Sequence, residues 1–341
     1  MVKPFQIPLT LLMLGGTLLL SPIFRICADP QLKTHKEVLK LMGSRFEISA
    51  VSADPQVAWE AIRAAISEIN RIEHLISSWD SLSQTSRINR MAGIEPVAVD
   101  PELYQLIERA KKVSVITGGA FDISYASMDR VWFYDGRMTA LPSPEAIAAS
   151  VALINYRDIE LNPAQTTVFL RNKGMKIGFG AIGKGYAADR AKEVMLNLGI
   201  ASGVVNAGGD LVAWGKQEDE RDWQVGIADP RNKEDIISWL STSEKAVVTS
   251  GNYEKFVELE GKTYGHIIDP RTGWPVGGLK SVTIICPSGE LADALATSVF
   301  ILGENDGLAL INKMKGIECI LVTADDELIT SDHLMLNYET E

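Results

Sequence analysis

The stretch IGFGAIGKGYAADRAKEVMLNLGIASGVVNAGGDLVAW, residues 177–214, is the part of the sequence that decides the fold. It opens on closely spaced glycines, Gly178, Gly180, Gly183 and Gly185, and continues into a segment whose apolar residues recur at helical spacing. Gly199 supplies the left-handed residue that ends such a helix. Backbone N–H groups at the start of the helix, with Lys184 beside them, predict a site for a phosphate group.

The residues from Gly178 to Gly185 come close to the P-loop pattern but miss its last position. There Gly185 replaces the serine or threonine whose hydroxyl would hold magnesium. If a nucleotide pyrophosphate binds here, its metal must be held by side chains from elsewhere in the chain. The alternative is a tight strand-to-helix turn that uses its glycines for packing alone.

The composition of the whole chain is that of a folded protein with an acidic surface. It has 341 residues, of which 46% are hydrophobic, and a formal net charge of −11. This charge argues against a nucleic-acid partner, so an anionic ligand must meet local cations. Because neither a repeat nor a low-complexity linker interrupts the chain, we predict one domain over residues 36–338.

The first 28 residues have the features of an export signal. Lys3 is followed by an apolar run over residues 9–23, which is shorter than a membrane span needs. Two alternatives remain for its end: cleavage after Ala28, or lipid modification of Cys27, which we favour. Either predicts an exported protein of the cell envelope or periplasm. Cys286 and Cys319 lie in apolar strand-like runs, so we expect buried free thiols.

Hydrophobic periodicity and turn residues predict a mixture of helices and strands. Helices are predicted over residues 57–76, 101–116, 142–151 and 290–302, and strands over residues 38–51 (interrupted at Met42-Gly43-Ser44), around 159, and over 167–170, 223–228, 246–250, 256–259 and 280–286. Residues 77–89 are predicted to be a polar loop. Trp79 in this loop either closes the core beneath it or lines a ligand cleft.

Three polar residues in the last third of the chain are candidates for chemistry. Asp293 and Thr297 are four residues apart on a predicted helix, so their oxygens form a half-site that suits magnesium. The alternative is a hydrogen bond between them on a partly exposed helix face. His266, which precedes a turn at Asp269-Pro270, is either a proton acceptor or a structural histidine.

Several motifs together resemble the FAD:protein FMN transferase (ApbE) family. They are Met42-Gly43-Ser44, Gly119-Ala120-Phe121-Asp122, Ala181-Ile182-Gly183-Lys184-Gly185-Tyr186-Ala187-Ala188-Asp189, Asn206-Ala207-Gly208-Gly209-Asp210, Thr249-Ser250-Gly251, His266-Ile267-Ile268-Asp269-Pro270-Arg271-Thr272-Gly273 and Ala292-Asp293-Ala294-Leu295-Ala296-Thr297. Each is weak alone, but their order over residues 38–338 is specific. The resemblance implies a single mixed α+β domain with the flavin in a cleft between two lobes.

The resemblance also implies roles for individual residues. The FAD site would include Met42, Trp79, Ala120, Phe121, Asp122, Lys184 and Ile267. The metal would be held by the backbone carbonyl of Ala181 and the side chains of Asp293 and Thr297. Gly178 belongs to the same cofactor site but stands where the family usually has an acidic residue, so one polar contact to the cofactor would be missing.

The activity that the resemblance implies is magnesium-dependent transfer of FMN from FAD to a threonine or serine of a target protein, with release of AMP. Lys184 and the metal would neutralise developing charge, and His266 is our candidate base. A FAD pyrophosphatase that yields FMN and AMP is one alternative, and a non-catalytic FAD-binding envelope protein is another. The joint presence of Asp293, Thr297 and His266 favours an enzyme.

The acceptor motif of the family is Ser/Thr-Gly-Ala-Ser/Thr, two residues, then the modified threonine or serine. This chain contains no such motif, so we expect another protein as acceptor. Given the export signal, the expected acceptor is an extracytoplasmic segment of a membrane redox complex.

Overall fold

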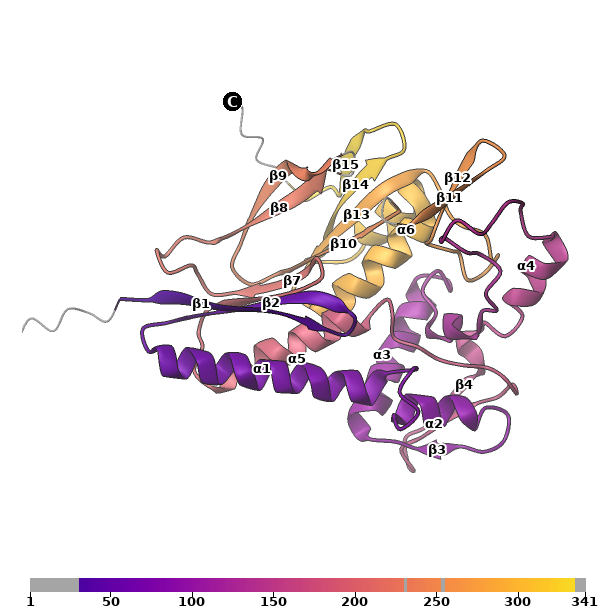
Figure 1. Ribbon diagram of the computed structural model, residues 1–341, viewed down its shortest axis with the longest axis horizontal. Helices are drawn as coiled ribbons and strands as arrows, with labels where there is room; N and C mark the ends of the chain where they lie inside the picture. The colour runs from indigo at the N-terminus through magenta and orange to yellow at the C-terminus, as the bar shows by residue number, and fades with distance from the viewer. Residues whose placement is uncertain (1–30, 230–231, 253–254, 335–341) are drawn as a thin grey trace, which may run out of the picture. The chain divides into compact units, whose positions relative to one another are not determined.

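An eight-stranded antiparallel sheet is the framework of the protein, with strand order β1-β2-β6-β7-β10-β13-β14-β15 (Figure 1). Its strands are β1 (Lys33–Leu41), β2 (Ser44–Ser52), β6 (Gly203–Ala207), β7 (Asp210–Trp214), β10 (Ala246–Gly251), β13 (Leu279–Cys286), β14 (Glu318–Thr323) and β15 (Leu328–Thr330). The computed structural model describes residues 31–229, 232–252 and 255–334. The signal over residues 1–28, including Cys27, and the end of the predicted domain at residue 338 lie outside them.

Helices and three small sheets complete the fold. The helices are α1 (Pro55–Ile76), α2 (Gln84–Arg90), α3 (Pro101–Ile116), α4 (Pro144–Ser150), α5 (Gly183–Asn197) and α6 (Gly289–Ile311), with 3₁₀ turns η1 (Ile123–Ser127) and η2 (Tyr156–Asp158). The small sheets pair β3 (Val97–Ala98), β5 (Thr167–Leu170) and β4 (Ile159–Asn162); β8 (Trp223–Asp229) and β9 (Asn232–Thr242); and β11 (Phe256–Leu259) and β12 (Lys262–Gly265). The predicted mixed α+β class is confirmed.

The large sheet is buried on both faces where β10 and β13 pair. Because side chains alternate along a strand, Val248 and Ile284 join the main core with α1, α5 and α6. Val247 and Ile285 point the other way and pack against β8. With both faces covered, β13 is buried at every position except Lys280, and the predicted free thiols Cys286 and Cys319 are enclosed.

Helix starts follow the capping signals in the sequence. Asp54 and Asp100 accept hydrogen bonds from backbone N–H groups two residues ahead, and a proline follows each of them as the first helical residue. Gly199 has a φ of 85° directly after α5, as predicted. Residues 77–89 are not a loop throughout, because α2 begins after the cap at Ser83.

The predicted strand over residues 38–51 is a hairpin. Met42 and Gly43 have φ angles of 48° and 73°, so the chain reverses between β1 and β2. Helix α6 is non-helical at Gly303, where φ is 78° and where we predicted a stop. It is long and apolar enough to cross a membrane, but half of its apolar window is buried and it packs on β10 and β13 as a core helix.

Candidate functional site

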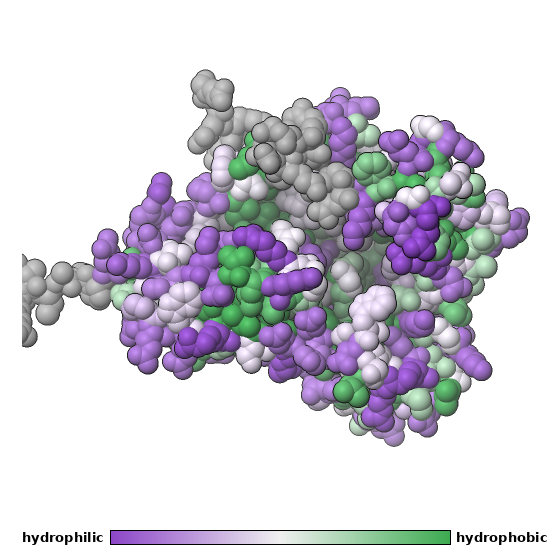
Figure 2. All heavy atoms as spheres, in the orientation of Figure 1, coloured by the Kyte–Doolittle hydropathy of each residue, from purple (hydrophilic) through white to green (hydrophobic). Residues whose placement is uncertain are grey.

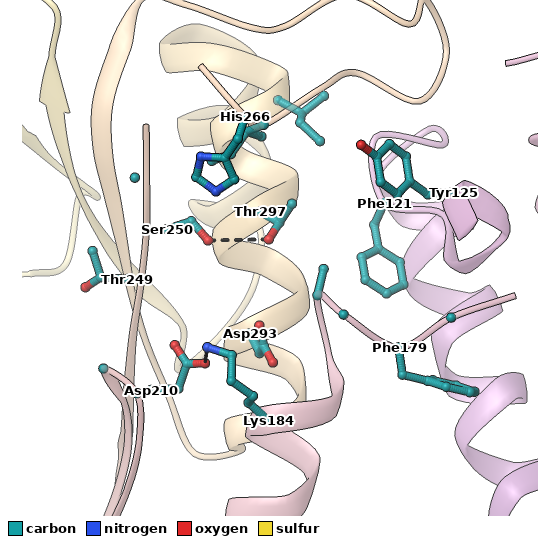
Figure 3. A pocket seen from close by; sticks show the side chains of 18 of the residues that line it. Phe121, Tyr125, Phe179, Lys184, Asp210, Thr249, Ser250, His266, Asp293 and Thr297 are labelled. Carbon is teal, nitrogen blue, oxygen red and sulfur yellow. Dashed lines mark hydrogen bonds and ion pairs between the residues drawn. The ribbon is translucent and has the colours of Figure 1, made fainter. Parts of the chain in front are cut away.

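A cavity of about 990 Å³ brings most of the predicted site residues together. Figure 2 shows the molecular surface hollowed beside the apolar patch at the centre of this face, and Figure 3 shows side chains that line the cavity. The predicted residues that line it are Trp79, Ala120, Phe121, Asp122, Gly178, Ala181, Lys184, His266, Ile267, Asp293 and Thr297. They come from α6, the start of α5, the loop before α5 and the segments around residues 79, 121 and 267.

Two residues of the expected flavin site are placed differently from the rest. Met42 does not line the cavity; it forms the β1–β2 turn, its backbone N–H donates to Glu73 Oε2 at 3.1 Å, and its side chain packs against the main core. Trp79 lies at the cavity but is 95% exposed. This exposure contradicts the alternative in which Trp79 closes the core beneath its loop.

The N-terminus of α5 faces a carboxylate of the protein itself. The N-cap residue Ile182 provides no side-chain hydrogen bond, and the N–H of Gly185 donates to Asp293 Oδ2 at 3.1 Å. We predicted that this helix end would bind a phosphate; its Gly185 N–H instead binds the metal-ligand candidate. The positive end of the helix therefore stabilises the ionised form of Asp293.

The glycine at position 185 is required by the close crossing of α5 and α6. A Cβ there would lie 2.0 Å from the carbonyl oxygen of Gly289 and 2.9 Å from the Cβ of Asp293. The packing interpretation is thus correct for Gly185. The missing P-loop hydroxyl has a physical cause, because a side chain at position 185 would push away the helix that carries Asp293.

A second carboxylate fixes the start of α6. Asp189 of α5 accepts hydrogen bonds from Ser288 Oγ at 2.9 Å, from Gly289 N at 2.8 Å and from Glu290 N at 3.0 Å. Burial raises the pKa of Asp189, and these three donors oppose the rise. Asp189 therefore caps a helix other than its own and sets the position of Asp293 one turn further along.

Asp293 is only 5% exposed, which contradicts the alternative that places it on a partly exposed helix face. Burial and the nearby Asp210 carboxylate raise the pKa of Asp293 to about 7, while the positive charge of Lys184 opposes this. Lys184 itself forms an ion pair with Asp210, drawn as a dashed line in Figure 3. The three groups form one cluster, and Asp210 is the member that the sequence analysis missed.

The donor set fits a small divalent cation. Within the described residues no group of three or more His, Cys, Asp and Glu side chains could hold a metal. The cavity instead offers the carboxylate of Asp293, the hydroxyl of Thr297 and the backbone of Ala181. A buried carboxylate whose charge is poorly compensated would be stabilised by a cation, and magnesium commonly uses few protein oxygens together with phosphate and water.

His266 lies on the cavity wall near the metal-ligand candidates. Its ring lies above Ser250 and Thr297 in Figure 3, and the hydroxyls of these two residues are 3.3 Å apart. The turn that follows is rigid, because Arg271 binds Asp269 through two N–H groups at 2.9 and 2.7 Å. His266 therefore lines the cavity beside these hydroxyls, with its Nδ1 buried.

Asp122 fixes the backbone on the aromatic side of the cavity through hydrogen bonds of its carboxylate. Its carboxylate accepts from Ser124 N at 2.8 Å, from Ser124 Oγ at 2.6 Å and from Tyr156 N at 2.7 Å, and burial raises its pKa. These bonds occupy the carboxylate that we expected to meet the cofactor. The neighbouring aromatic side chains Phe121 and Tyr125 lie on this side of the cavity (Figure 3), and Phe179 is also among its lining residues.

Gly178 leaves little room for the acidic residue usual at this position. Its N–H donates to Ile123 O at 2.9 Å, and a Cβ would lie 3.1 Å from the Cβ of Ala126. The contact is tighter than ordinary packing. The glycine therefore matches its immediate surroundings, and this wall of the cavity is formed by backbone and small side chains.

Comparison with known proteins agrees with this fold. The model of the ApbE family matches residues 42–321. A Klebsiella pneumoniae protein named FAD:protein FMN transferase is 31% identical over 300 residues, which are 87% of this chain and 92% of the relative. A Treponema pallidum protein of the same name is 33% identical over 291 residues, covering 79% of this chain and 80% of the relative.

Solved structures show the same architecture. The crystal structure of the ApbE protein from Thermotoga maritima matches with a TM-score of 0.80 and 30% identity, covering 88% of this chain and 97% of its own. The flavinyl transferase ApbE from Pseudomonas stutzeri matches with a TM-score of 0.77 and 26% identity, covering 88% and 94%. The resemblance inferred from the motifs is confirmed, and the chain belongs to the ApbE family.

Proposed function

We propose that this protein is a flavin transferase that moves FMN from FAD to a threonine or serine hydroxyl of another protein and releases AMP, with magnesium as cofactor. In this reaction the acceptor oxygen forms a bond to the FMN phosphorus, and the bond from that phosphorus to the oxygen of AMP breaks. One observation carries the proposal: Lys184, His266, Asp293 and Thr297 converge on a single cavity of about 990 Å³. Such a volume is at the upper end of ligand pockets, as a dinucleotide requires.

The residues around Asp293 would neutralise the negative charge of the substrate pyrophosphate. Asp293, Thr297 and the carbonyl of Ala181 would hold magnesium, which supplies charge neutralisation on the pyrophosphate when bound. Lys184 adds a positive charge and is kept in place by Asp210. The Gly185 N–H favours the ionised form of Asp293, which is the form that binds a cation.

His266 would accept the proton of the attacking hydroxyl. An unperturbed histidine titrates near neutral pH, and this side chain lies on the cavity wall beside Ser250 and Thr297. In phosphoryl transfer most of the rate enhancement comes from positioning and electrostatics. We therefore expect loss of Asp293 to reduce turnover more than loss of His266.

The flavin would bind on the aromatic side of the cavity. Phe121, Tyr125 and Phe179 line this side, and the exposed Trp79 lies where a ring system could stack on it. The curated relatives are named for FAD and FMN, which agrees with a flavin substrate.

The cellular setting is proposed from the sequence. Residues 1–28 have the composition of an export signal, and a lipid on Cys27 would hold the enzyme at a membrane surface. Tethering would raise its effective concentration near extracytoplasmic segments of membrane redox complexes, which are the proposed acceptors.

The test is to incubate residues 29–341 with FAD, magnesium and an acceptor domain, then to search by mass spectrometry for an FMN phosphodiester on the acceptor. Asp293→Asn keeps the volume of the side chain and should abolish the label. Asp306→Asn changes an exposed carboxylate of the same helix and is the matched control. Release of FMN and AMP without any labelled acceptor would identify a pyrophosphatase, and full transfer in excess chelator would contradict the metal site.

A further inference from the structure

A second hollow adjoins the proposed catalytic cavity. It has a volume of about 770 Å³ and shares with the catalytic cavity the lining residues Trp79, Tyr125 and His266. We call this hollow the side groove. A polypeptide hydroxyl must approach the flavin phosphate next to the candidate base, and the side groove reaches the catalytic cavity where His266 lies.

The side groove is basic although the chain is acidic. Its charged lining residues are Arg90, Arg130 and Lys176, against one carboxylate, Asp129, whereas the formal net charge of the whole chain is −11. Within the parts of the chain that the structure describes, none of the three cations forms an ion pair. Arg90 donates to the backbone carbonyl of Ser81 at 2.7 Å, and Arg130 lies over the ring of Phe133.

Unusually exposed apolar side chains lie beside these cations. Trp79 and Leu82 are 95% and 91% exposed, and both belong to the loop between α1 and α2 that contributes Ser81 to the side groove. Large apolar side chains exposed together next to a concave surface are typical of protein-binding sites. The wall of the groove adds the aromatic residues Trp132 and Tyr134.

We propose that the side groove binds the acceptor polypeptide through acidic residues that flank the modified threonine or serine. This inference rests on the proposed transferase function. Arg90, Arg130 and Lys176 supply charge complementarity, Trp79 supplies apolar contact in the groove, and the exposed Leu82 of the same loop extends this apolar surface. Because the side groove and the catalytic cavity meet at His266, an acceptor bound in the groove would place its hydroxyl next to the candidate base.

The experiment uses two synthetic peptides that contain the family acceptor motif, one flanked by aspartates and the other by lysines. Binding is measured by fluorescence anisotropy, and transfer is measured by mass spectrometry with FAD and magnesium. The wild-type protein should bind the acidic peptide at least about tenfold more tightly, with the difference reduced at high salt. Lys176→Glu and Arg130→Glu should remove this preference.

Lys173→Glu is the matched control, because Lys173 is exposed near Lys176 but does not line the side groove. FAD binding should be unchanged in all three variants. Equal binding of the two peptides by the wild type, or a preference retained in Lys176→Glu and Arg130→Glu, would overturn the proposal.

The failure of the proposed transferase function is separable from the failure of the side groove. Selective binding of the acidic peptide without any transfer would refute the transferase and support the groove. Transfer that ignores the flanking charge would support the transferase and refute the groove. If neither peptide is bound or labelled, both proposals are wrong.

Discussion

Replacement of Gly185 by serine would restore the P-loop pattern in sequence, and we expect it to damage the protein. The new Cβ would lie 2.0 Å from the carbonyl oxygen of Gly289, 2.4 Å from its carbonyl carbon and 2.9 Å from the Cβ of Asp293. Real Cβ atoms essentially never come within 3.0 Å of other atoms. The start of α6 would therefore have to shift by about 1 Å relative to α5.

The cost of this shift can be estimated from the packing. Overpacking of a core costs about 1–3 kcal/mol, and the upper end applies here because the nearest atoms belong to backbone. A loss of about 3 kcal/mol should lower the melting temperature by about 6–12 °C. The shift would also displace Asp293 from the N–H of Gly185, and a misplacement of this size can cost about 100-fold in rate.

The assay compares Gly185→Ser with Gly180→Ser by calorimetry. Gly180 lies in the loop that leads into α5, and a Cβ there would meet nothing within 4 Å, so its replacement should change stability by less than about 0.5 kcal/mol. If the two variants melt at the same temperature, the close crossing of α5 and α6 does not determine the residue at position 185.

Further predictions concern the cavity and its supports. Because the raised pKa of Asp293 makes ionisation costly in the folded state, the melting temperature of the metal-free protein should fall as the pH rises from about 4 to about 7 and should level off above that. Asp293→Asn should lack this fall, and identical pH profiles of the two proteins would contradict the assignment. Asp189→Ala removes the acceptor of three hydrogen bonds and should lower the free energy of unfolding by about 2–4 kcal/mol in urea titrations, unlike exposed Asp306→Ala. His266→Asn should lower turnover far more than FAD affinity in single-turnover and binding experiments; collapse of FAD binding with normal chemistry would make it a binding residue.

The elements predicted well from sequence are those whose signals are local. The helices predicted over residues 57–76 and 101–116 begin within two residues of their observed starts at Pro55 and Pro101, because a helix start depends mainly on adjacent residues. Helix α2 was missed because Ile88 is the only apolar residue among its buried positions, so its amphipathic pattern is too weak.

The sequence predicted most of the residues that line the site, but it did not predict how these residues contact one another. The spacing of Asp293 and Thr297 follows from helix geometry, so the pair could be recognised from sequence. The burial of Asp293 could not, because it depends on a crossing between helices that are distant in the chain. Asp210 was missed for the same reason, since its partner Lys184 is on a different element.

The hydrogen bond from Gly185 to Asp293 joins residues 108 positions apart, whereas the binding loop of a P-loop protein is continuous in sequence. A metal site of this kind does not exist until the two helices have met, so the unfolded chain has no comparable affinity for the ion. Magnesium should therefore act as a ligand of the native state alone and add RT ln(1 + [Mg²⁺]/Kd) to its stability. The proposed export would place folding outside the cytoplasm, where the divalent cations of the surroundings would then favour completion of folding as well as the proposed reaction.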